Sequence, residues 1–316
     1  MIAPGNLSPG LWTGGASLRR RQEGLLLGLW ENHGYREVAP PLLLPEGLPS
    51  ARSQDPLRDR AATLQDPGGA VLRLRADFTL ALSLMVAAQR PSGTDPLRLS
   101  YAGPVVRRPA PDLEEGWEIY QAGLERISPG DDGGEGDREV LRLAAASLLE
   151  LGLGGALLEL GHWGVAGPLL KRQPWPEEGR RALEGALNRK SLRTLEELEG
   201  RYGASEESAL LKALLHVGGR PAEVEALEPR LRRAGVWAPW EELRALEAAL
   251  RSDFPDLPVR LDPVDVRRWS TYTGLTFKAF TPRHPFAVLS GGRYDGLYPS
   301  LGLPLGAVGF ALRLPL

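Results

Sequence analysis

The stretch that decides the fold is Leu99-Ser100-Tyr101-Ala102-Gly103-Pro104-Val105-Val106-Arg107, which leads through a polar loop into Tyr120-Gln121-Ala122-Gly123-Leu124-Glu125. The first run reads as a strand over 97–106 and the second as a returning strand over 117–127, so together they predict a long antiparallel hairpin. Side chains alternate between the two faces of a strand. We therefore expect Gln121, Gly123 and Glu125 to share one face.

This polar face has two interpretations. A hairpin with one solvated face is common in antiparallel sheets. Alternatively the face binds a ligand, with Gly123 leaving space and with Gln121 and Glu125 offering an amide and a carboxylate. The hairpin residues alone leave both interpretations open.

Around the hairpin, hydrophobic periodicity predicts an α+β fold with a mostly antiparallel sheet. Helices are expected over 17–32, 77–89 and 138–151, with Asp77 as a cap of the second. Strands are expected over 71–75, 156–160, 259–261, 276–279, 286–289 and 306–310. A composition shift marks residues 165–251 as a mostly helical insertion, which leaves 1–164 and 252–316 as the core.

Composition excludes several classes of function. The 316 residues carry a net charge of -2, with four histidines and no cysteine. The missing cysteines exclude thiol catalysis, disulfides and cysteine-bound metals, and no cofactor is expected. A charge so close to neutral favours neither nucleic acid nor an anionic membrane as a partner. No segment reads as a secretory signal or a membrane span, so we expect a cytoplasmic protein.

Six segments, in order along nearly the whole chain, resemble the catalytic core of class II aminoacyl-tRNA synthetases of the histidyl type. They are 34–38 with Pro41, 74–79, 103–125, 266–277, 290–297 and 306–312. The first resembles the motif through which these enzymes dimerise. The resemblance implies a class II synthetase-like antiparallel sheet flanked by helices, with a helical insertion.

Departures from the synthetase pattern fall where ATP is held. Pro109 stands where the second class motif has a glutamate, and Trp117 where it has an arginine. The histidine signature is altered over 267–272. Pro315 and Leu316 stand at the end of the third motif in place of an ATP-gripping arginine. Adenylation requires cations on the developing phosphate charge, so these departures argue against that reaction.

The amino-acid side of the synthetase pattern is better kept. The resemblance implies that a histidine pocket would use Asp77, Thr79, Arg107, Gln121, Glu125, Arg267 and Tyr272. Glu125 and Asp77 would pair with the α-ammonium, and Arg107 and Arg267 would face a carboxylate. Tyr272 would contact the imidazole.

A synthetase-like chain that keeps such a pocket and lacks an anticodon domain is similar to the regulatory subunits of ATP phosphoribosyltransferase. This resemblance implies a non-catalytic chain that self-associates as a dimer within a hetero-oligomer. Its protein partner would be the short-form catalytic subunit, and its ligand would be histidine. No nucleic acid and no membrane is expected as a partner. The alternatives are a truncated ligase that activates an amino acid and a stand-alone amino-acid sensor. An RNA-binding module is disfavoured by the charge.

Overall fold

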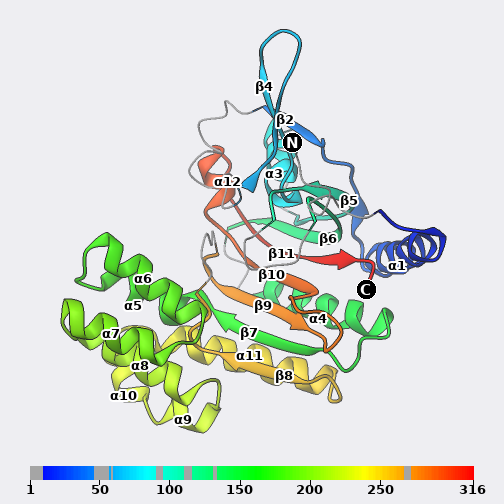
Figure 1. Ribbon diagram of the computed structural model, residues 1–316. Coiled ribbons are helices and arrows are strands. Elements are labelled where there is room, and N and C mark those ends of the chain that lie inside the picture. Colours follow the sequence, from blue (N-terminus) through cyan, green and yellow to red (C-terminus); the bar gives the residue numbers. More distant parts are fainter. Residues whose placement is uncertain are drawn as a thin grey trace. The chain divides into compact units, whose positions relative to one another are not determined.

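The computed structural model describes residues 10–45, 57, 60–89, 95–109, 116–130, 134–266 and 272–316. The chain divides into two compact units (Figure 1). The first unit comprises Met1–Gly154 and Thr281–Leu316, and the second comprises Gly155–Phe280.

The predicted hairpin is confirmed and forms the centre of the sheet in the first unit. Four antiparallel strands lie in the order β5 (Leu97–Val106), β6 (Glu118–Pro129), β11 (Leu305–Leu314) and β10 (Leu289–Arg293), and β1 (Arg36–Glu37) runs parallel to β5 at the edge. The register places Glu125 of β6 opposite Gly309 of β11, and Gly123 opposite Tyr101 of β5.

One face of this sheet is apolar and is covered by α1 (Thr13–Glu31) and α4 (Glu135–Glu150). Phe310 of β11 points to this face and meets the ring of Trp30 edge-on, with ring centroids 5.8 Å apart. The indole of Trp30 donates a hydrogen bond of 2.9 Å to Ser147 of α4. Trp30 and Phe310 are buried, so the apolar alternation of β11 builds the core of this unit.

The other face meets the N-terminus of α3 (Phe78–Gln89). The ring of Phe78 stacks on Tyr101 at 4.1 Å. Asp77 accepts a hydrogen bond of 3.2 Å from the backbone N–H of Leu80, which confirms it as the cap of this helix. The short helix α12 (Leu297–Ser300) also contacts α3. A separate small sheet consists of β2 (Leu43–Pro45), β4 (Val71–Leu74) and β3 (Thr63–Gln65).

The second unit combines three strands with a set of helices (Figure 1). Strand β7 (Leu157–His162) pairs in parallel with β8 (Val259–Asp262) and antiparallel with β9 (Leu275–Phe280). The helices are α5 (Trp163–Arg172), α6 (Glu177–Asn188), α7 (Leu192–Tyr202), α8 (Glu206–Val217), α9 (Pro221–Glu225), α10 (Glu228–Arg233) and α11 (Trp237–Asp253). This unit thus contains strands as well as helices, and a separate helical domain over 165–251 stays a prediction.

One predicted strand is misplaced. We expected a strand over 286–289, whereas β10 runs from Leu289 to Arg293 and includes both glycines of the Gly-Gly-Arg segment. Gly291 and Gly292 pair with Phe310 and Gly309 of β11, so backbone pairing overrides the turn tendency of a glycine pair. Within the described part of the chain, no helix has the length and apolar character that crossing a bilayer requires.

Candidate functional site

The polar face of β6 meets the start of α3, and four predicted site residues belong to these two elements. Glu125 and Gln121 come from β6, where their even spacing places them on one face as expected. Asp77 caps α3 and Thr79 lies in its first turn. The hydroxyl of Thr79 donates a hydrogen bond of 3.2 Å to the Glu125 carboxyl, which joins the two elements.

Glu125 is the centre of a cluster of hydroxyl groups. Its side chain is buried, with 2% of its surface exposed. Besides Thr79, the hydroxyl of Tyr294 donates to Oε2 at 2.5 Å, and that of Tyr101 lies 3.5 Å from Oε1. The three hydroxyls come from α3, from β5 and from the residue that follows β10. We call Asp77, Thr79, Tyr101, Glu125 and Tyr294 the Glu125 cluster.

Two glycines make room for this cluster. A Cβ added to Gly309 would overlap the Glu125 carboxylate, which therefore lies directly on the backbone of β11. A Cβ on Gly123 would lie 2.6 Å from the Tyr101 hydroxyl. The expectation that Gly123 leaves space for a ligand is thus wrong, because the ring of Tyr101 occupies that space.

Burial dominates the electrostatics of Glu125. Removal from water raises the pKa of this carboxyl to about 8, and the charge of Asp77 adds to the rise. Hydrogen bonds from Tyr294 and Thr79 act in the opposite direction but do not outweigh the burial. The pKa of Tyr294 is raised well above its ordinary value by burial and by the neighbouring Glu125. Both groups are therefore mainly protonated at neutral pH.

The remaining predicted site residues fall in different places. Arg107 is buried, and its guanidinium donates to the backbone carbonyl of Ala76 at 3.3 Å, next to Asp77. Gln121 is buried and lies opposite Arg313 in the sheet. Tyr272 belongs to the second unit and is half-buried, and Arg267 lies outside the described residues. The structure thus joins Thr79 to Glu125 directly, and the charge of Asp77 acts on the same carboxyl.

Sequence reasoning missed the roles of Tyr101, Tyr294 and Gly309. Tyr101 is within the quoted hairpin, but only the register shows that it lies beside Gly123. Tyr294 is 169 residues from Glu125 along the chain. The run Arg293-Tyr294-Asp295 between glycines indicated a functional segment, but it did not indicate that Tyr294 bonds to Glu125.

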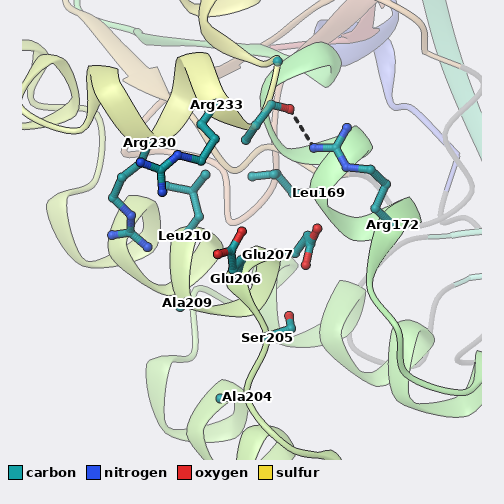
Figure 2. Close-up of a pocket in the computed structure, with 12 residues that line it drawn as sticks. Leu169, Arg172, Ala204, Ser205, Glu206, Glu207, Ala209, Leu210, Arg230 and Arg233 are labelled. Carbon is teal, nitrogen blue, oxygen red and sulfur yellow. Dashed lines mark hydrogen bonds between the residues drawn. The ribbon is translucent and has the colours of Figure 1, made fainter.

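The second unit contains a cleft of about 640 Å³ between α5, α8 and α10 (Figure 2). Arg172, Arg230 and Arg233 line it together with Glu206 and Glu207. Arg172 donates a hydrogen bond of 2.8 Å to the carbonyl of Ala234. Side chains of both charges therefore line the cleft.

Comparisons with known proteins cover nearly the whole chain. A family model described as histidyl-tRNA synthetase matches residues 14–315. The ATP phosphoribosyltransferase regulatory subunit of Thermus thermophilus is 37% identical over 315 residues, which cover 95% of this chain and 81% of the relative. That of Deinococcus radiodurans is 35% identical and covers 97% of this chain and 73% of the relative.

Solved structures confirm the fold. A Bacillus halodurans protein titled "ATP phosphoribosyltransferase regulatory subunit/histidyl-tRNA synthetase" gives a TM-score of 0.83 at 26% identity, over 99% of this chain and 81% of that chain. A histidyl-tRNA synthetase from Nostoc matches with a TM-score of 0.76 over 99% of this chain and 73% of that chain, at 16% identity, which supports the fold alone. The predicted class II synthetase-like α+β core is therefore confirmed. Because the high-identity relatives match along most of both chains, this protein belongs to the family of ATP phosphoribosyltransferase regulatory subunits.

Proposed function

We propose that the protein is the non-catalytic regulatory subunit required for ATP phosphoribosyltransferase activity in the first step of histidine biosynthesis. It acts by assembling with the short-form catalytic subunit, as a dimer within a hetero-oligomer in the cytoplasm. The observation that carries this proposal is the 37% identity to the Thermus thermophilus subunit over most of both chains. A Thermotoga maritima structure titled as an ATP phosphoribosyl transferase (HisG:HisZ) complex matches this fold with a TM-score of 0.69 over 94% of this chain and 98% of that chain, at 22% identity.

Reconstitution tests the subunit role. The full chain is mixed with a short-form catalytic subunit, and the mixture is assayed for transfer of the phosphoribosyl group to ATP and for co-elution on a sizing column with light scattering. We expect activity that depends on both chains and a hetero-oligomer larger than either. A catalytic subunit that is fully active alone and does not co-elute with this chain would contradict the proposal.

Loss of synthetase chemistry is the second part of the proposal. Pro109 follows the end of β5 and has neither a side-chain oxygen nor a backbone N–H with which to hold ATP. We expect no histidine-dependent exchange between pyrophosphate and ATP in the presence of magnesium. Exchange above a no-enzyme control that disappears in Arg107→Ala would identify the chain as a ligase instead.

The Glu125 cluster is the centre of the proposed histidine site. A buried carboxyl beside Asp77 suits an α-ammonium, because Glu125, once ionised, and Asp77 both attract a cation. The guanidinium of Arg107 donates to the carbonyl of Ala76, the residue before Asp77. It would bind the carboxylate of the amino acid whose α-ammonium lies at Glu125. Gln121, on the same strand face as Glu125, supplies an amide. Arg267 and Tyr272 stay candidates for binding the carboxylate and the imidazole of histidine, respectively.

Calorimetric titration of histidine into the full chain tests this pocket. A charge-assisted hydrogen bond contributes about 1.5–3 kcal/mol, so Glu125→Gln is expected to weaken binding roughly 10- to 150-fold. The matched control is Glu118→Gln, which makes the same change at an exposed position of β6 and is expected to bind as the unaltered chain does. Absence of heat up to millimolar histidine, or equal affinity in both variants, would remove the pocket and leave the subunit role intact.

A further inference from the structure

Among the described residues, the groups that donate hydrogen bonds to Glu125 are uncharged hydroxyls, and the charge of Asp77 that acts on it is acidic. Glu125 receives hydroxyls from three separate elements and lies against the backbone of β11 at Gly309. Its side chain is 2% exposed, and among the described residues none forms an ion pair with it. The titratable or hydrogen-bonding groups that face it are Asp77 before α3, Thr79 of α3, Tyr101 of β5, Tyr294 after β10 and Tyr298 of α12.

A carboxylate buried without a cation is costly, and such a group ordinarily takes up a proton. Burial of Glu125 and the nearby charge of Asp77 favour that form, and the hydroxyls that bond to the carboxyl oppose it only in part. Oε1 lies within hydrogen-bond distance of two hydroxyls, and Oε2 is held by Tyr294. These hydrogen bonds thus keep the carboxyl in place without a counter-ion. A cation that enters the site would favour the ionised carboxylate over the protonated form.

We propose that Glu125 is a proton-exchange site, which holds a proton in the free protein and gives it up when the α-ammonium of an amino acid binds, so that binding is coupled to pH. The coupling rests on the proposed histidine pocket. The O–H bond of the carboxyl breaks and its proton passes to the solvent. The electron pair left on the carboxylate then accepts a hydrogen bond from the ammonium, so that one proton leaves for each amino acid bound.

The direction of the pH effect follows from linkage. With a pKa of about 8, the carboxyl is about nine-tenths protonated at pH 7 and half protonated at pH 8. Binding therefore releases about 0.9 proton at pH 7 and about 0.5 at pH 8. Raising the pH toward 8 removes the cost of expelling the proton, and the affinity for the amino acid rises.

Calorimetry in two buffers of different ionisation enthalpy measures the protons released. Histidine is titrated into the full chain at pH 7, and the unaltered chain is expected to release about 0.9 proton more than Glu125→Gln. Any proton released by the imidazole of histidine is the same for both chains, so it cancels when the two values are subtracted. At pH 8, Tyr294→Phe removes a hydroxyl that favours the carboxylate, so its release is expected to rise from about 0.5 toward one proton. The matched control, Tyr298→Phe, removes a buried hydroxyl that is not bonded to Glu125, and its release is expected to stay near 0.5.

Infrared difference spectroscopy covers the case in which Glu125→Gln binds too weakly for calorimetry. The carbonyl stretch of a protonated carboxyl is expected in the free chain at pH 7, and it should fade on addition of histidine and be absent from Glu125→Gln. Equal proton release in the chain and the variant, or no such stretch in the free chain, overturns the coupling and leaves the pocket standing. Failure of histidine to bind overturns the coupling together with the pocket.

Discussion

Replacing Glu125 by glutamine is expected to change how the stability of the protein depends on pH. In the folded state, burial raises the pKa of this carboxyl from 4.5 to about 8. In the unfolded chain it titrates near its ordinary value. The folded state therefore binds more protons than the unfolded state between these two values, and stability falls as the pH rises through this window. The contribution is fully present below the unfolded pKa and is lost as the pH passes the folded pKa.

The size of this effect follows from the two pKa values. Integration of the linkage relation from pH 5 to pH 8 gives a loss of about 3–4 kcal/mol in the free energy of unfolding. Glutamine has a similar shape but does not titrate, so Glu125→Gln is expected to lack this loss. The difference is large against a typical domain stability of about 5–15 kcal/mol.

Urea denaturation at several pH values between 5 and 8 measures the effect, with the midpoint and slope determined for the unaltered chain and for Glu125→Gln. Subtraction of the two profiles removes the contributions of all other titrating groups. Parallel profiles would refute the reasoning, because they would mean that Glu125 is as ionised in the folded state as in the unfolded one.

Three further changes test other parts of the structure. Phe310→Ala is expected to lower the free energy of unfolding by about 3–5 kcal/mol because the ring is packed against Trp30, whereas Leu25→Ala on the exposed side of α1 should cost less than about 1 kcal/mol. Glu139 receives hydrogen bonds of 2.7 and 2.8 Å from Arg98. Burial opposes its ionisation, but these bonds, the hydrogen bond from Tyr35 and the charges of Arg98 and Arg126 together lower its pKa. Its contribution is therefore present above its unfolded pKa and lost as the pH falls through its folded value, and Glu139→Gln should show a flatter decline of stability in acid denaturation. Gly309→Ala should displace the Glu125 carboxyl, and a crystal structure of this variant with an unmoved carboxyl would contradict the role given to that glycine.

Much of the fold follows from local patterns. The strand limits of 97–106 match β5, and the caps and periodicity of α3 place that helix within one residue. Phe78, Leu82, Phe277 and Phe310 lie at apolar positions of the periodic pattern of their elements, and all four are buried. These predictions succeed because a two-residue or 3.6-residue period reports which face is buried without reference to the rest of the chain.

The two-residue alternation of side chains along a strand alone placed Gln121 and Glu125 on one face of β6. The helix cap at Asp77 could be predicted from its position before an apolar run. The limits of β10 could not be predicted from the sequence, because a glycine pair has no intrinsic preference for a strand. Its place in the sheet depends on hydrogen bonds to β11.

The sequence by itself determined the α+β class, the hairpin and the shared face of Gln121 and Glu125. Tertiary structure alone decided the environment of Glu125, since Tyr294 lies 169 residues away and Tyr101 reaches the carboxyl only through the hairpin register. It also reversed the reading of Gly123, whose missing side chain accommodates a tyrosine ring. The physical reason is that the alternation of side chains is a local property, whereas burial, and with it the proton affinity of a carboxyl, depends on which distant segments enclose it.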